Sequence, residues 1–213
     1  MAAADSPSAE WQRPLFTPEV AARLDRLATH LPPSCQQILE VRLGDDSQVD
    51  LSVQVATAEE ARQLLAVPLP DGVHRLLRSW SDRSGPLAPA SRLWLEFDLP
   101  SAAPAVPTPV VCARLEPTAP ASWLSTILFP ALLDRPLEPA VRHQVELAVA
   151  SLPPGARVLY AFALGARPGP AVRLEVCGFA DVAGALAYWR RRVGPDADEL
   201  AQLAPLCAGL ERL

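Results

Sequence analysis

The 213-residue sequence contains no lysine and no asparagine, so all 19 of its strongly basic side chains are arginines. Mutational bias in a GC-rich bacterial genome accounts for this, and it also suits the abundant alanine and proline. Without lysine, the chain can offer no Schiff-base lysine, no phosphate-loop lysine and no Ser-Lys dyad. The HExxH, GxSxG and GxGxxG patterns are absent too, which removes the local signatures of several enzyme classes.

Aromatic residues make up only 6% of the chain, and its net charge is −5. Both features argue against nucleic-acid binding, which relies on basic surface and aromatic stacking. No run approaches the roughly 20 apolar residues that span a bilayer. Residues Met1 to Glu10 lack the basic and apolar regions of a signal peptide. We therefore expect a cytoplasmic protein that binds neither nucleic acid nor membrane.

Histidine and cysteine are sparse and widely separated in the sequence. The histidines His30, His74 and His143 fall on three predicted helices, where we expect surface or capping roles. The four cysteines form no CxxC pair, so no metal site and no cofactor is specified. They are Cys35, Cys112, Cys177 and Cys207. Two disulfides in a secreted protein are the alternative, but the apolar runs around Cys112 and Cys177 favour free buried thiols.

Half of the residues are hydrophobic and a fifth are charged, which is typical of a globular protein. Thr57 and Glu60 form a capping-box pattern at the start of a helix. Residues 122–133 indicate an apolar helix that is interrupted near Pro130. Strict alternation from Leu93 to Leu99 predicts a strand.

The second half of the sequence repeats the order of elements in the first half, at a constant offset of 121 positions. An ungapped alignment of residues 17–65 with 138–186 contains 9 identities in 49 positions. The apolar phase of the strands is also kept, and this phase decides which face of a sheet a side chain occupies. Duplication explains the recurrence, and coincidence within an ordinary helix–hairpin–helix order is the alternative.

The predicted fold is α+β, with internally duplicated α-β-β-α units, a mainly antiparallel sheet and helices packed on one face. A disordered N-terminal tail over residues 1–13 precedes a single globular domain over 14–213. Two related halves, about 14–85 and 134–213, are joined in that domain by a central β-β-α segment, about 86–133.

Trp94, Glu96 and Asp98 are expected on one face of the predicted strand because side chains alternate along a strand. Two neighbouring carboxylates beside an aromatic ring form a candidate acid/base pair. They are also candidate oxygen ligands for a hard cation. The simpler interpretation is a solvated strand face on which an arginine from an adjacent strand pairs with the carboxylates.

Arg114 with Glu116, and Arg173 with Glu175, repeat this placement of charges on one strand face. We therefore predict a ligand-binding surface that includes Trp94, Arg114, Arg173 and Glu175, with an arginine holding a carboxylate or phosphate. The alternative is a cross-strand ladder of ion pairs. A further basic cluster, residues 190–192, ends a helix, where arginine is favoured by the helix dipole.

Two classes of function follow from these patterns. The first is a non-enzymatic accessory module that binds a ligand, a protein partner or a second copy of itself. The second is an enzyme that acts on a small anionic metabolite, with Glu96 and Asp98 as its acid and base.

Overall fold

The computed structural model describes residues 17–41, 49–99, 106–117, 119–165, 167 and 171–193. The predicted N-terminal tail over residues 1–13 lies outside these residues. Within the described part, none of the helices combines the length and the apolar character needed to cross a membrane.

Six strands form one sheet in which every neighbouring pair is antiparallel. The strands are β1 (Gln37–Val41), β2 (Val49–Val55), β3 (Ala90–Asp98), β4 (Val110–Leu115), β5 (Arg157–Ala163) and β6 (Val172–Cys177). Their order across the sheet is their order in the chain. The mixed α and β content and the antiparallel sheet that we predicted are therefore confirmed.

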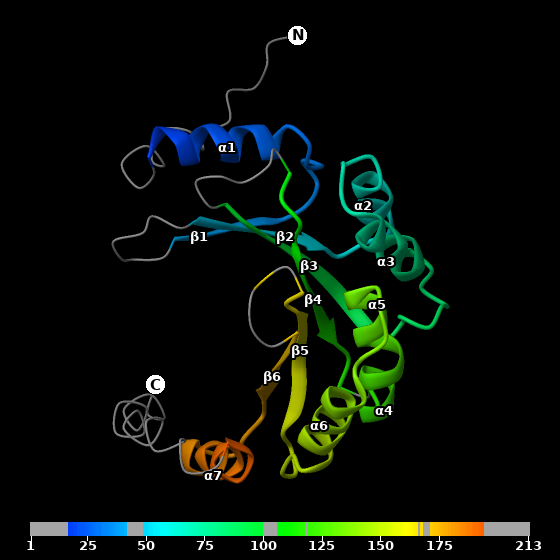
Figure 1. The fold of residues 1–213 in the computed structure, drawn as a ribbon, viewed down its shortest axis with the longest axis vertical. Helices are drawn as coiled ribbons and strands as arrows, with labels where there is room; N and C mark the ends of the chain where they lie inside the picture. The colour runs from blue at the N-terminus through cyan, green and yellow to red at the C-terminus, as the bar shows by residue number, and fades with distance from the viewer. Residues whose placement is uncertain are drawn as a thin grey trace.

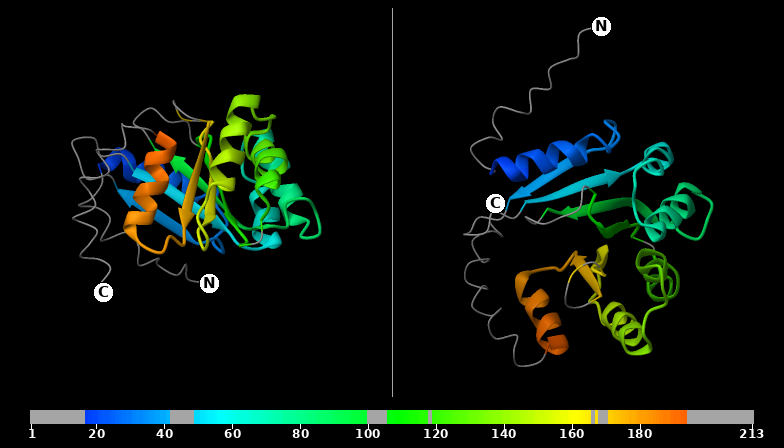
Figure 2. Two further views of the ribbon diagram at one scale, coloured as in Figure 1. Left: turned by 90° about the horizontal axis from the view of Figure 1, so that it is seen from below. Right: turned by 45° about the horizontal axis from the view of Figure 1, so that its top comes forward.

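The helices are α1 (Pro18–Ala28), α2 (Ala58–Leu64), α3 (Asp71–Ser81), α4 (Ala121–Trp123), α5 (Phe129–Leu133), α6 (Pro139–Ala150) and α7 (Val182–Val193). Figure 1 shows α2 to α6 along one side of the sheet. Figure 2 shows α1 beside the β1–β2 hairpin and α7 near β6, at opposite ends of the sheet. The predicted capping box is present: Glu60 N–H donates to the Thr57 hydroxyl at 3.2 Å, and Thr57 N–H donates to the Glu60 carboxylate at 3.0 Å.

Strand β3 divides its side chains between the core and the opposite face of the sheet. Leu93, Leu95 and Phe97 are fully buried against the helices. Trp94 and Glu96 point the other way and are half-buried. Burying each large apolar side chain stabilises the fold by about 1.5–3 kcal/mol, so this face anchors β3 at the centre of the sheet.

A π-helical turn, η1 (Leu124–Leu128), joins α4 and α5 where the sequence predicts one helix interrupted near Pro130. Proline has no N–H to donate, and in an α-helix its ring collides with the carbonyl four residues earlier. In the wider turn, Phe129 N–H donates to the Leu124 carbonyl. Pro130 then lies in the first turn of α5, where proline is tolerated.

Strand β2 is more buried than its sequence pattern indicates. Alternating apolar and polar residues are typical of a half-buried strand, yet all seven residues of β2 are buried. Asp50, Ser52 and Gln54 are only 2%, 8% and 7% exposed, although they face away from the apolar core. The reason is the sheet itself, which curls over this face and covers polar side chains that a flat sheet leaves in water.

The curvature is visible in Figure 1, where β1 and β2 are nearly horizontal and β5 and β6 are nearly vertical. A twist of roughly 20–25° per strand accumulates to about 100° or more over six strands. In a flat sheet the outermost strands would lie about 24 Å apart, at about 4.8 Å per strand. Curling brings β1 and β6 around one concave face, and this is the face that carries the candidate site.

Candidate functional site

A cavity of about 370 Å³ lies on the concave face, and residues from all six strands line it. This volume is within the range of about 300–1,000 Å³ that is usual for ligand pockets. The first hairpin, formed by β1 and β2, makes one wall of the cavity with Ile38, Glu40, Asp50 and Ser52. Cross-strand pairing sets their order, because Ile38 lies opposite Ser52 and Glu40 lies opposite Asp50.

Strands β3 and β4 form the floor of the cavity. The second hairpin, formed by β5 and β6, makes the other wall. The floor consists of Trp94, Glu96 and Cys112. On the second hairpin, aromatic residues alternate with charged ones across the strand pair, since Phe162 lies opposite Arg173 and Tyr160 lies opposite Glu175. The cavity thus combines aromatic ring faces with carboxylates.

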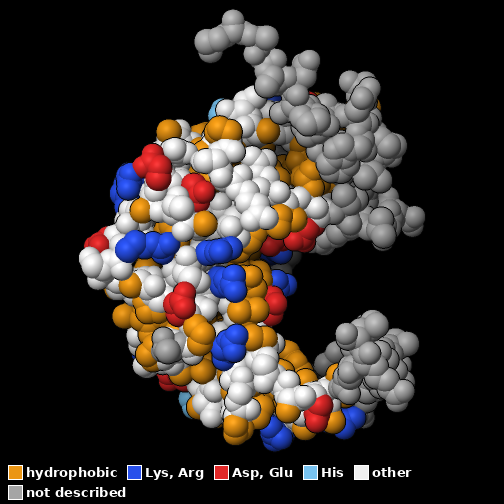
Figure 3. All heavy atoms as spheres, turned by 180° about the vertical axis from the view of Figure 1, so that it is seen from behind, with side chains coloured by type: hydrophobic (Ala, Val, Ile, Leu, Met, Phe, Trp, Pro, Cys, Tyr) orange, Lys and Arg blue, Asp and Glu red, His pale blue; other side chains and the backbone are white. Residues whose placement is uncertain are grey.

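Negative charge prevails in the cavity. Its acidic lining residues are Glu40, Asp50, Glu96 and Glu175, and its basic ones are Arg167 and Arg173. Figure 3 shows acidic and basic side chains together at the inner end of the hollow on the right of that view. The excess of carboxylates favours a cationic group over an anionic one.

Arg167 precedes β6 and reaches back to β3. Its Nε donates to Asp98 Oδ2 at 2.7 Å, and its Nη2 donates to Glu96 Oε1 at 2.5 Å. All three side chains are mostly buried, with 14–27% of each exposed. The hydrogen bond to Asp98 contributes most to raising the pKa of Arg167, burial opposes it, and Glu96 adds to it. The arginine is therefore a fixed positive charge that holds both carboxylates.

Asp50 brings a third carboxylate to this group. One oxygen each from Asp50, Glu96 and Asp98 lie within 4.8 Å of one another, a spacing that a hard cation can bridge. Arg167 donates to two of the three carboxylates. The guanidinium thus supplies positive charge to this group of carboxylates.

Arg173 is held by an aromatic ring. Its guanidinium carbon lies 4.0 Å from the centroid of the Phe162 ring, in cation–π contact. The Phe162 and Tyr160 rings are 6.3 Å apart. The cavity wall therefore already contains one stacked guanidinium beside a second aromatic ring.

Cys112 lies at the floor of the cavity and is 3% exposed. Burial raises the pKa of its thiol well above the usual range, and the charge of Glu175 adds to the effect. The thiolate is the nucleophilic form of cysteine, so this thiol is not activated for attack.

The structure brings most of the predicted site residues together. Trp94, Glu96, Arg173 and Glu175 line the cavity, and Asp98 joins them through Arg167. Their assignment to catalysis or to ligand binding stays a prediction.

Arg114 is separate from this group. It faces Arg92 on β3 and Tyr160 on β5, and it does not belong to the described lining of the cavity.

Sequence reasoning missed Arg167 and the wall formed by the first hairpin. The expected arginine partner of Glu96 and Asp98 comes from the β5–β6 connection, and an adjacent strand does not supply it. No periodic pattern marks an arginine in a turn. In contrast, Asp50 and Ser52 alternate with apolar residues in the sequence, and this alternation was a usable signal for their common face.

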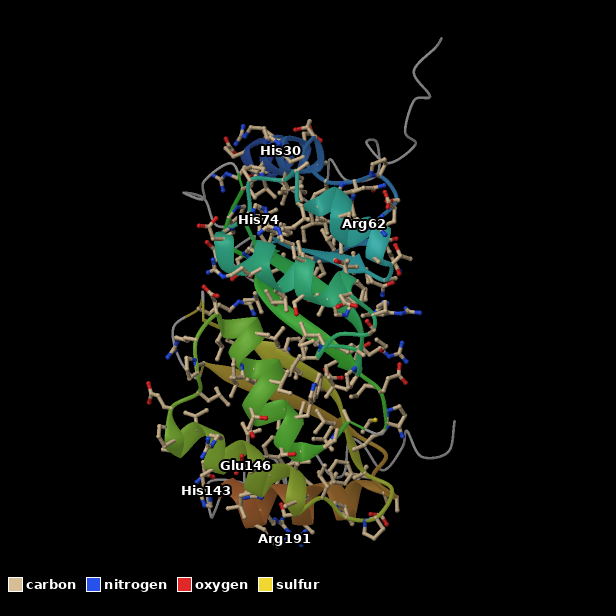
Figure 4. All side chains as sticks on the ribbon, turned by 90° about the vertical axis from the view of Figure 1, so that its right-hand side faces the viewer. His30, Arg62, His74, His143, Glu146 and Arg191 are labelled. Atoms are coloured by element: carbon tan, nitrogen blue, oxygen red, sulfur yellow. The ribbon has the colours of Figure 1, made fainter. Side chains whose placement is uncertain are left out.

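The three histidines belong to the helical side of the molecule. Figure 4 shows His30 in the turn after α1, His74 on α3 and His143 on α6. His74 Nε2 is hydrogen-bonded to the Val67 carbonyl at 2.9 Å, a structural role. The described lining of the cavity includes no histidine.

No protein-family model, curated protein or solved structure matched this chain.

Proposed function

We propose that the protein is a non-enzymatic binding module whose concave sheet face takes up a ligand or a segment of a protein partner. One observation carries this proposal: six strands converge on a single cavity in which Glu96 and Asp98 both accept hydrogen bonds from Arg167. Aromatic rings and carboxylates line the cavity and are available to contact a ligand. Its paired carboxylates are already engaged as acceptors.

The alternative function, an acid/base enzyme acting on an anionic metabolite, has less support from this geometry. A general acid must donate a proton to the substrate, whereas Glu96 and Asp98 are both oriented to accept from a guanidinium. An anionic metabolite would also face four carboxylates in the cavity. Arg167, the arginine best placed to neutralise it, is committed to Glu96 and Asp98.

We also propose that the two halves of the chain arose by duplication. The aligned stretches contain α1, β1, β2 and α2 in the first half, and α6, β5, β6 and the start of α7 in the second. A two-fold axis between β3 and β4 would superpose β1 on β6, whereas the alignment pairs β1 with β5. We therefore propose halves displaced along the sheet, with their helices on its convex face, so that the concave face stays free for a ligand.

The proposed setting is a bacterial cytoplasm. Cys35, Cys112 and Cys177 are free thiols, as expected in a reducing compartment.

Native mass spectrometry of protein purified from its own cells tests the binding proposal. We expect a companion molecule that dissociates on denaturation and is lost from Trp94→Ala, which alters the cavity floor. The control is Trp189→Ala, which removes a 43% exposed indole outside the cavity and should retain the companion. Retention by a folded Trp94→Ala variant, or conversion of the companion into a product, would overturn the proposal.

A further inference from the structure

Building on the proposed binding function, we infer that the group recognised in the cavity is a guanidinium, carried by an arginine side chain. The first argument is that the cavity already holds two guanidinium groups of the protein itself. Arg167 donates hydrogen bonds to two carboxylates, and Arg173 is stacked on an aromatic ring. These are the two ways in which proteins bind guanidinium groups selectively.

The same two features recur where a ligand can reach them. Tyr160 offers a ring and lies directly opposite Glu175, which offers a carboxylate. Glu175 and Glu40 are exposed and line the cavity from opposite walls. Neither has a hydrogen bond or an ion pair within the described residues. A planar cation between these walls could stack on a ring and meet a carboxylate.

Ser52 supplies an independent observation. It lies opposite Glu96 in the sheet, lines the cavity and is only 8% exposed. Its hydroxyl makes no hydrogen bond to any residue that the structure describes. None of the described buried side-chain oxygens lacks a hydrogen-bond partner, so the Ser52 hydroxyl is open to the cavity, where it can accept a hydrogen bond from a ligand.

The balance of donors and acceptors selects the ligand. A guanidinium carries five N–H donors and no acceptor, whereas the carboxylates and Ser52 offer oxygens. An ammonium group, although also cationic, is a compact charge without a plane to stack or a fork to pair. The cavity therefore matches arginine better than lysine.

The test is an NMR titration of the ¹⁵N-labelled full chain with three capped amino acids: N-acetyl-argininamide, its citrulline counterpart and its lysine counterpart. Citrulline keeps the shape of arginine without the charge. We expect the Trp94 indole N–H signal to shift with arginine, and the citrulline compound to bind at least about tenfold more weakly. The lysine compound should bind at least about threefold more weakly than the arginine compound.

Two variants with the same change of charge provide the matched comparison. Glu175→Gln should weaken arginine binding about threefold to fivefold, in line with one partly exposed ion pair. Glu138→Gln alters an exposed glutamate ahead of α6, outside the cavity, and should leave binding unchanged. Equal effects of the two variants would mean that only net charge matters and would overturn the inference.

Free L-arginine and a Gly-Gly-Arg-Gly-Gly peptide distinguish the two sources of the guanidinium. Tighter binding of the peptide indicates an arginine on a protein partner, and tighter binding of the free amino acid indicates a metabolite. Equal binding of the lysine and arginine compounds would overturn the guanidinium inference while leaving the binding function in place. If no cation shifts the Trp94 signal and native mass spectrometry shows no companion, the binding function fails as well.

Discussion

Arg167 Nε donates a 2.7 Å hydrogen bond to Asp98 Oδ2, although 69 positions separate the two residues in the chain. The contact passes over β4 and ties the β5–β6 connection to β3. Since the second hairpin forms one wall of the cavity and β3 its floor, this bond fixes the wall relative to the floor.

Replacing Arg167 with alanine should therefore lower the free energy of unfolding by about 1–3 kcal/mol, because two mostly buried carboxylates lose their shared partner. Urea unfolding followed by circular dichroism measures this change. The control is Arg62→Ala, whose ion pair with Glu59 is about 60% exposed on both sides and should cost less than about 0.5 kcal/mol.

A second substitution checks the cause of this effect. Adding Asp98→Asn to Arg167→Ala removes one of the three clustered negative charges of Asp50, Glu96 and Asp98. The double variant should then be no less stable than Arg167→Ala alone. Equal costs for Arg167→Ala and Arg62→Ala would contradict the role assigned to Arg167.

Gly178 is the glycine whose replacement should be most damaging at the end of the second hairpin. Its φ is +82°, and a Cβ there would overlap the carbonyl oxygen of Gly155. We expect Gly178→Ala to destabilise the protein by about 1–3 kcal/mol, from left-handed strain and collision with backbone. Thermal unfolding measures it.

Gly165→Ala is the matched control for this glycine. A Cβ at Gly165 would meet only the Leu133 side chain, at an ordinary 3.5 Å. A change of less than about 0.5 kcal/mol is expected there, as for most uncritical sites. Similar losses for both variants would show that glycine entropy, and not the close approach, sets the cost.

Arg192 should stabilise the packing of α7 on α6. Its guanidinium donates to the Ser151 hydroxyl and to the Leu147 carbonyl, at the C-terminal end of α6. The arginine therefore caps α6, a neighbouring helix, while its own helix is α7. We expect Arg192→Ala to cost about 1 kcal/mol in urea unfolding, because α6 loses a charged partner at its negative end.

Arg190→Ala is the control, since Arg190 is exposed on the same helix. It should change stability by less than about 0.5 kcal/mol. If both arginines mattered equally, the effect would come from the general charge of the helix end and not from the bonds to α6.

The Cys35 thiol should be unreactive in the native protein. Burial raises its pKa to about 11, so about one thiol in a thousand is ionised at pH 8. Alkylation at pH 8, read by mass spectrometry of peptides, should label Cys35 only after unfolding, while the more exposed Cys177 reacts earlier.

Cys35 also makes stability depend on pH. The unfolded thiol releases its proton at about pH 9, before the folded one at about pH 11, so the folded state is penalised as pH rises between these values. The free energy of unfolding should fall over this window, and Cys35→Ala should flatten the decline. Rapid labelling of Cys35 in native protein at pH 8 would contradict the burial.

The strands were predictable because their apolar and polar residues alternate. Leu93, Leu95 and Phe97 identify the core face of β3, and Trp94 and Glu96 identify the other face. The capping box of α2 was predictable because Thr57 and Glu60 interact locally. These features need only neighbours in the sequence, which is why one sequence is sufficient to find them.

The cavity was not predictable in the same way. Its existence depends on accumulated twist, which places β1 and β6 around one concavity, and no residue pattern encodes that curvature. Arg167 illustrates the same limit, since its partner Asp98 is distant in the chain. Arg114 has the spacing expected of a site residue, but its place in the sheet turns out to be outside the lining.

The order of the strands in the sheet, identical to their order in the chain, has a consequence for biosynthesis. Each strand pairs with the one that left the ribosome just before it, so the sheet can grow by addition at one edge during synthesis. The contact between Arg167 and β3 must wait until the second hairpin, β5–β6, has been synthesised. The nascent chain therefore completes the cavity only when β6, the last strand, has joined the sheet.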